Sequence, residues 1–170
     1  MTKAELLDLV SRFADRPVPA LATGRHVYLW HGQLNYLKAA LPTDLSISPI
    51  DLHQLTVALA RTPRADNEAQ RLLRQVIQQE INTYLTSNSQ QIFVVTGCDL
   101  LSRYRVSLNP FFEIASEKRM IIFVVSSSET RFQPPPSLPT YIELNPAVPF
   151  EYLQTFIGLA ATISADEDKQ

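Results

Sequence analysis

The residues best placed to do chemistry follow a buried strand near the middle of the chain. The apolar run 91–95 ends at Thr96 and Gly97, and Asp99 is the carboxylate nearest to its end. Magnesium-dependent phosphoryl transfer needs a strand-end carboxylate to hold the metal and a further group to orient the attacking water. Thr96 and Gly97 stand at those two places. The alternative interpretation is that Asp99 hydrogen-bonds the turn that follows it, because one acid alone does not position magnesium.

The turn after the first predicted strand is where a phosphate-binding loop would lie. It consists of His31, Gly32 and Gln33, and Lys38 lies inside the helix that follows rather than at its start. A phosphate loop needs several successive backbone N–H groups in a glycine-permitted curl, together with a lysine. The chain has only four glycines, which lie far apart, and it contains neither glycine-rich nucleotide motif. We therefore expect no nucleotide cofactor, although a helix N-terminus alone can hold an anion weakly.

Catalysis and metal binding are not indicated by the remaining polar residues. His26, His31 and His53 share no ligand spacing with Cys98 or with a pair of acids. No serine or cysteine stands in the helix-end or elbow context that activates a nucleophile. Ser126 ends a later buried strand, and a polar residue there either senses a phosphate or stays in the turn. The sequence predicts a protein that is not an enzyme and that holds no metal.

Arginines in two stretches are candidates for contact with nucleic acid. Arginine suits phosphates and carboxylates, and the alternative is a solvated helix face. Aromatic residues for base stacking are few, since only Tyr104 lies among the second group. The candidates are Arg61, Arg64, Arg71 and Arg74 in the first stretch, with Arg103 and Arg105 in the second.

Four apolar side chains are candidates for a surface that binds a partner protein. They flank loops at the carboxyl ends of predicted strands, where ligands and partners of open α/β sheets gather. The proline-rich segment 134–139 is predicted to be stiff, so it would present side chains at low entropic cost. The first two candidates have the alternative of packing inward, because aromatic pairs are common in cores. The four are Phe111, Phe112, Phe132 and Leu138.

Composition narrows the class of protein. The chain has 170 residues, of which 45% are hydrophobic and 19% charged, and its net charge is −2. This suits one core, and it provides no strong overall field to attract nucleic acid or anionic lipid. A single cysteine is typical of a reducing cytosol, and no run approaches the ~20 apolar residues of a membrane span. We expect a cytoplasmic protein that does not enter a membrane.

Apolar strands alternate with amphipathic helices along the chain. Such strands need cover on both faces, which favours a mostly parallel sheet of about five strands between two helical layers. Residues 1–163 are predicted to form one α/β domain, and residues 164–170 a disordered acidic tail. Strands are expected at 26–30, 45–48, 91–95, 120–125 and 140–144. Helices are expected at 3–14, 34–41, 51–59, 66–86, 107–116 and 148–159.

Three segments in order resemble the strand-and-loop pattern of AAA+-like P-loop domains: residues 26–41, 91–101 and 119–128, followed by the strand predicted at 139–144. The resemblance implies a P-loop NTPase-like fold in which the nucleotide motifs are missing. In this pattern six residues form the remnant of a nucleotide site: His31, Gly32, Gln33, Thr96, Asp99 and Ser126.

A narrower stretch is similar to the small P-loop-like accessory proteins of bacteriophage-exclusion (BREX-type) defence loci. It runs through the Thr96-Gly97 strand end, Arg105, Leu108-Asn109 and the strand at 121–123, and it covers about 35 residues. This resemblance implies a role in prokaryotic antiviral defence beside larger protein subunits of the same system.

Three functions follow from these observations, in order of preference. The first is a non-catalytic assembly or adaptor subunit, which would be a pseudoenzyme that acts through protein–protein interaction. The second is an accessory module that contacts DNA or another nucleic acid. The third is a nucleotide-binding protein with an unorthodox site.

Overall fold

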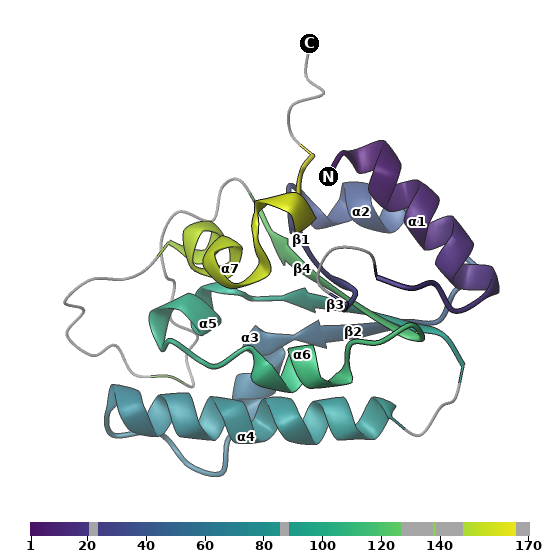
Figure 1. Cartoon of the computed structure of the whole chain (residues 1–170). Helices are drawn as coiled ribbons and strands as arrows, with labels where there is room; N and C mark the ends of the chain where they lie inside the picture. The colour runs from purple at the N-terminus through teal and green to yellow at the C-terminus, as the bar shows by residue number, and fades with distance from the viewer. Residues whose placement is uncertain (21–23, 86–88, 127–137, 139–147, 166–170) are drawn as a thin grey trace.

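A parallel sheet runs through the centre of the molecule, with helices on both of its faces (Figure 1). The structure is a computed structural model that describes residues 1–20, 24–85, 89–126, 138 and 148–165. The sheet has the order β2-β3-β4-β1-β5, and every pair of neighbours is parallel. The strands are β1 (Val27–His31), β2 (Ile47–Asp51), β3 (Gln91–Thr96), β4 (Arg119–Val125) and β5 (Thr162–Ser164).

The helices connect these strands and precede the first of them. The long helix α4 has the clearest amphipathic pattern, and its buried face includes Leu73, Ile77 and Ile81. A capping box between Thr2 and Glu5 begins the first helix. The elements are α1 (Lys3–Asp15), α2 (Leu34–Ala40), α3 (Leu52–Leu55), the 3-10 turn η1 (Thr56–Ala58), α4 (Asp66–Tyr84), α5 (Asp99–Arg103), α6 (Asn109–Ile114), α7 (Pro149–Ile157) and the 3-10 turn η2 (Leu159–Ala161).

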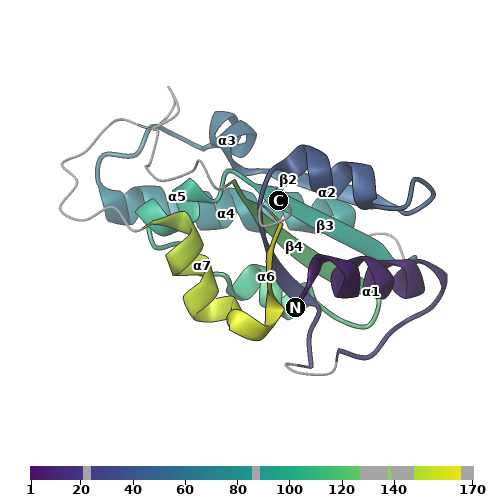
Figure 2. The ribbon, with the colours of Figure 1, turned by 90° about the horizontal axis from the view of Figure 1, so that it is seen from above.

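The two faces of the sheet are covered by different helices (Figures 1 and 2). On one face, Tyr84 of α4 meets Phe93 of β3 edge to face, and Phe111 of α6 meets Phe123 of β4 in the same way. Helices α1 and α2 cover the opposite face. The central strands are buried on both sides, which explains their continuous apolar sequences. The predicted three-layer α/β fold is confirmed, and it is consistent with a P-loop-like architecture.

The two edge strands of the sheet, β2 and β5, differ in how they limit pairing with a further strand. Strand β2 alternates between exposed and buried residues, and its exposed Pro49 has no N–H to offer another strand. The Pro49 carbonyl accepts a hydrogen bond of 3.1 Å from the Tyr84 hydroxyl. At the other edge, β5 pairs only with Leu29–His31 of β1, so the first part of β1 extends beyond it. One edge is therefore blocked, whereas the other ends in a strand of three residues.

The structure corrects the end of the predicted domain. Ser164 was expected to begin the disordered tail, but it pairs with His31 in β5, and Ala165 donates its N–H to the His31 carbonyl at 2.9 Å. Strand β5 was not predicted because three residues are too few to show a periodic pattern. The strand expected at 140–144 lies outside the described residues, as do residues 166–170 of the expected tail. The short helix α5 was also missed.

Candidate functional site at the carboxyl edge of the sheet

The parallel strands bring most of the predicted remnant site to one edge of the sheet. In the observed register His31 is opposite Val125, and Thr96 is opposite Asp51. Ser126 directly follows β4 and is half-buried. The ends of β1, β2, β3 and β4 therefore lie together at the edge where open α/β sheets bind their ligands.

The β1–α2 turn is held by contacts within the chain. Gly32 donates its N–H to the Val125 carbonyl at 2.9 Å, which continues the sheet ladder by one residue. The Trp30 indole N–H donates to the Gln33 carbonyl at 3.3 Å. The His31 ring stacks on Phe150 of α7, with 4.0 Å between ring centroids. Because the Gly32 N–H is used in the ladder and an aromatic ring covers His31, this turn does not present the donor nest that a phosphate requires.

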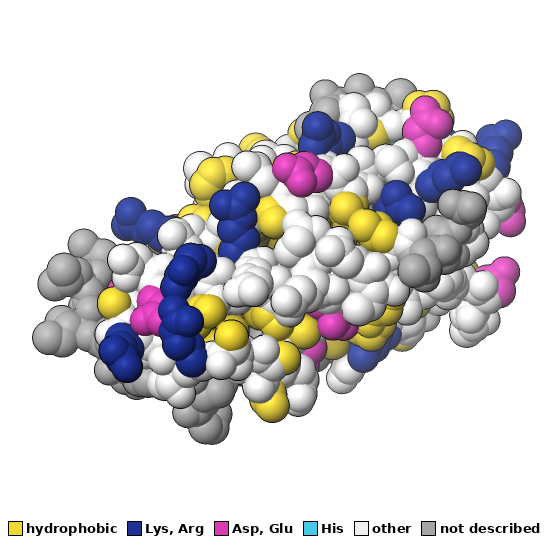
Figure 3. Space-filling view, turned by 90° about the horizontal axis from the view of Figure 1, so that it is seen from below, with side chains coloured by type: hydrophobic (Ala, Val, Ile, Leu, Met, Phe, Trp, Pro, Cys, Tyr) yellow, Lys and Arg dark blue, Asp and Glu magenta, His cyan; other side chains and the backbone are white. Residues whose placement is uncertain are grey.

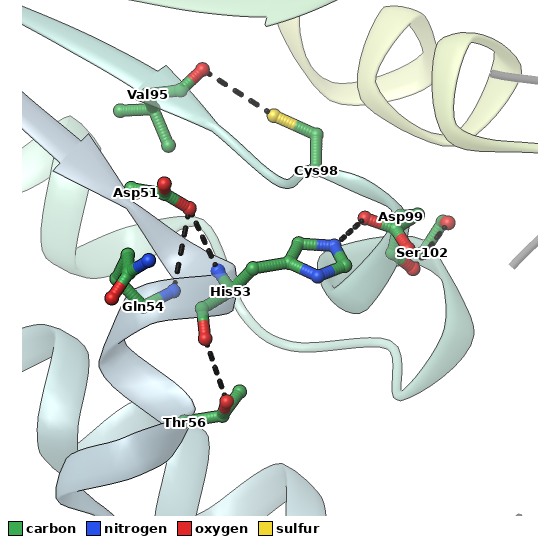
Figure 4. A network of polar contacts seen from close by, with 8 residues as sticks. All are labelled: Asp51, His53, Gln54, Thr56, Val95, Cys98, Asp99 and Ser102. Atoms are coloured by element: carbon green, nitrogen blue, oxygen red, sulfur yellow. Dashed lines mark hydrogen bonds and ion pairs between the residues drawn. The ribbon is translucent and has the colours of Figure 1, made fainter. Parts of the chain in front are cut away.

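The strongest polar contact of the edge joins His53 to Asp99 (Figure 4). His53 Nε2 lies 2.6 Å from Asp99 Oδ1, so the imidazole N–H donates to the carboxylate. The Asp99 side chain is 8% exposed and the His53 side chain 36% exposed. Asp99 is therefore committed to His53, and this contact links the region after β2 to the region after β3.

Local backbone contacts position the imidazole. Asp51 caps α3 by accepting hydrogen bonds from the N–H groups of His53 at 3.1 Å and Gln54 at 3.3 Å. The Thr56 hydroxyl donates to the His53 carbonyl at 2.6 Å. His53 thus stands at the first turn of a capped helix, directly after an edge strand.

Gly97 allows β3 to turn beneath the imidazole. Its φ is +75°, a left-handed conformation that non-glycine residues rarely adopt. A Cβ atom at this position would lie 2.6 Å from His53 Cδ2 and 3.0 Å from the His53 backbone nitrogen. Gly97 is therefore required both by the backbone conformation and by the close approach of His53.

The chemistry open to this arrangement is limited. A His–Asp pair can act as a general base when a nucleophile lies within reach. The Cys98 thiol is buried and donates to the Val95 carbonyl at 3.6 Å, on the side away from the imidazole (Figure 4). The Ser102 hydroxyl donates to the Asp99 carbonyl at 3.0 Å. These two contacts are local to the turn that follows β3, whereas the His53–Asp99 contact joins the region after β2 to the region after β3. The pair is therefore suited to hold the two loops together.

His53 is the residue of this site that sequence reasoning missed. His53 and Asp99 are 46 residues apart, and only the adjacency of β2 and β3 brings them together. No local motif signals that adjacency.

The predicted arginines lie in different environments, and contacts of α4 with Arg103 and Arg105 bring the two stretches near each other. Arg103 is bidentate to Asp66, at 2.9 and 3.3 Å, and its side chain is only 7% exposed. Arg61 pairs with Glu68. These two arginines are therefore neutralised within the fold. The other four are exposed: Arg64, Arg71, Arg74 and Arg105.

The predicted partner surface needs correction. Phe111 and Leu138 are fully buried, so the alternative of inward packing holds for Phe111, and neither residue forms a surface. Phe112 is half-buried, and Phe132 lies outside the described residues. The carboxyl edge of the sheet therefore does not carry the expected apolar group among the residues that the structure describes.

Large apolar side chains are exposed at several places among the described residues, which include Tyr36 of α2 and Val57 of η1, and two more lie together at and just after the end of α7. Phe156 is 55% exposed and Leu159 is 77% exposed. Leu159 lines a hollow of about 620 Å³ between α1, the start of β1 and η2, and Phe156 and Phe112 line a second hollow of about 320 Å³. Ile157 borders both hollows. We call Phe112, Phe156 and Leu159, with the two hollows, the α7-end surface.

The floor of the larger hollow contains a buried polar pair. His26 Nδ1 lies 2.8 Å from the Tyr28 hydroxyl, and His26 Nε2 donates to the Val18 carbonyl, which can only accept. Burial raises the pKa of Tyr28 to about 12, so its phenol keeps its proton at physiological pH. These contacts fix the floor of the hollow.

Neither a metal centre nor a membrane span is found within the described ranges. No three His, Cys, Asp or Glu side chains there are grouped closely enough to hold a metal ion. None of the described helices is long and apolar enough to cross a bilayer. Comparison of the chain with family models, curated proteins and solved structures finds no match.

Proposed function

We propose that this chain is a non-catalytic assembly subunit on an AAA+-like P-loop scaffold. The exposed apolar α7-end surface carries this proposal. Exposed apolar side chains that lie next to each other and to a mostly apolar hollow are typical of a surface that binds another protein, whereas single ones such as Val57 are normal. The expected occupant is a larger protein subunit of the same system, in keeping with the resemblance to accessory proteins of BREX-type defence loci.

The carboxyl edge supports the non-catalytic part of the proposal. The β1–α2 turn uses its Gly32 N–H in the sheet, and the His31 ring is covered by Phe150. Asp99, the acid nearest in the sequence to the end of β3, is held by His53. These contacts favour a stable scaffold over the third function considered, a nucleotide site.

We expect no hydrolysis of ATP or GTP by the purified chain. Phosphoryl transfer needs positioning and neutralisation of the phosphates at the same time, and neither a loop lysine nor a paired acid is present in the sequence to provide them. The measurement is phosphate release in the presence of magnesium. Turnover that is lost in Asp99→Asn, with folding unchanged, would refute this prediction.

The partner surface is tested by charge substitution at exposed positions. Phe156→Asp and Leu159→Asp are expected to abolish co-purification of the larger subunit, because each places a carboxylate in an apolar contact. Val57→Asp is the matched control, since Val57 is 79% exposed on η1, outside the α7-end surface. Recovery of the subunit is compared by mass spectrometry after affinity purification from the native host. Equal recovery with all three variants, each with wild-type circular dichroism, would exclude this surface.

A further inference from the structure

The exposed arginines near the start of α4 come from two segments that the fold brings together. Gln70 of α4 donates a hydrogen bond of 2.7 Å from its side-chain nitrogen to the Arg105 carbonyl. Arg71 and Arg74 are three residues apart on the same helix, so their side chains emerge from neighbouring positions. Figure 3 shows Lys and Arg side chains towards both ends of the underside of the molecule, with several close together on the left beside an acidic side chain. We call Arg64, Arg71, Arg74 and Arg105 the arginine face.

Acidic residues cancel only part of this charge. Glu68 pairs with Arg61 and accepts the backbone N–H of Arg64 at 2.9 Å. These hydrogen bonds, the backbone one first, lower the pKa of Glu68, as do the charges of Arg61 and Arg71, so the Glu68 carboxylate also offsets part of the Arg71 charge. Asp66 is bound to Arg103. The arginine face is therefore a local positive patch on a chain whose net charge is −2.

Arg105 adds an independent observation. Its φ is +50°, and among the described residues it is the only one other than glycine with a positive φ. It follows the end of α5, where the Val106 N–H bonds to the Leu101 carbonyl, the pattern of a helix end that glycine normally completes. An arginine in this left-handed conformation is strained relative to glycine. Such strain at an exposed arginine points to a use for its side chain.

We propose that the arginine face binds the phosphate backbone of a nucleic-acid duplex without reading its sequence. A duplex fits better than a single strand, because single-strand sites combine arginines with exposed aromatic rings. The two tyrosines that the described residues place beside this face do not present an exposed ring: Tyr104 is buried, with the Arg103 guanidinium carbon 5.0 Å from its ring centroid, and Tyr152 is half-buried. Phosphate contacts alone hold a protein on a duplex and carry no base information. The arginine face shares no residue with the α7-end surface, although Tyr152 contacts both regions: its hydroxyl donates to the Val106 carbonyl at 3.0 Å, and its ring meets Phe156 edge to face.

The test is fluorescence anisotropy with short DNA and RNA duplexes of mixed sequence over a range of salt concentrations. Four phosphate contacts give a slope of log K against log salt of about −3 to −4, a loss of roughly 100-fold in affinity for a fourfold rise in salt. The double variant Arg71→Ala/Arg74→Ala is expected to reduce the slope by about 2. Arg16→Ala, an exposed arginine at the end of α1, is the control and is expected to change nothing.

Substitutions of Arg105 distinguish a loss of nucleic-acid binding from a loss of folding. Arg105→Gly is expected to reduce the slope by about 1 while the melting temperature stays equal or rises, because glycine relieves the strain. Arg105→Lys is expected to keep the slope. Three outcomes would overturn the proposal: no duplex binding at low salt, an unchanged slope in the double variant, or binding to polyglutamate with equal affinity, which would indicate an acidic protein partner instead.

Discussion

Gly97→Ala is expected to destabilise the fold by about 2–4 kcal/mol, adding the cost of a left-handed alanine to that of a steric overlap. The new Cβ would lie 2.6 Å from His53 Cδ2 and 3.0 Å from the His53 backbone nitrogen. The imidazole would have to move away from Asp99, and the contact that joins the region after β2 to the region after β3 would be lost. Chemical denaturation of the purified variant measures the free energy of unfolding.

Gly24→Ala is the matched control for this prediction. Gly24 has a similar φ of +71°, but a Cβ there meets nothing within 4 Å. Its substitution therefore measures the backbone strain alone, about 1 kcal/mol. In a His53→Ala background, Gly97→Ala is expected to cost less, because its nearest contact has been removed. Equal costs for the two glycines would show that His53 does not lie against Gly97.

Phe111→Ala is expected to cost about 3–5 kcal/mol, whereas Phe112→Ala costs about 1 kcal/mol or less. Phe111 is fully buried and meets Phe123 edge to face, with 5.0 Å between ring centroids. Its loss leaves a cavity beneath the sheet that the neighbouring strand cannot fill. Phe112 is only half-buried. Thermal and urea denaturation of both variants provide the measurement, and similar small losses would contradict the position of α6.

The sequence was informative about the body of the fold because its signals are local. Continuous apolar runs predicted β3 and β4, and the amphipathic pattern of residues 66–86 predicted α4 to within two residues at its end. The parallel sheet followed from strands that need cover on both faces. Strand β5 could not be predicted, since three residues carry no period, and its place beside β1 depends on the whole topology.

Less of the candidate site than of the fold could be predicted from the sequence. The residues at the strand ends were recognised because a parallel sheet places them at one edge. The His53–Asp99 contact depends on strand order, which no local pattern encodes. Burial of Phe111 and Leu138 likewise depends on what packs above them, so an apolar residue beside a loop was not a reliable sign of an exposed surface. The ion pairs of Arg61 with Glu68 and of Arg103 with Asp66 also could not be predicted without the fold.

The central claim is that the chain functions as an assembly subunit rather than as a free enzyme. Native mass spectrometry of the chain, recovered from its host at its endogenous level, tests this most directly. We expect a complex of fixed stoichiometry with a larger subunit. Leu159→Asp is expected to dissociate this complex, and Val57→Asp is expected to leave it intact. Recovery of the wild-type chain solely as a free monomer would contradict it.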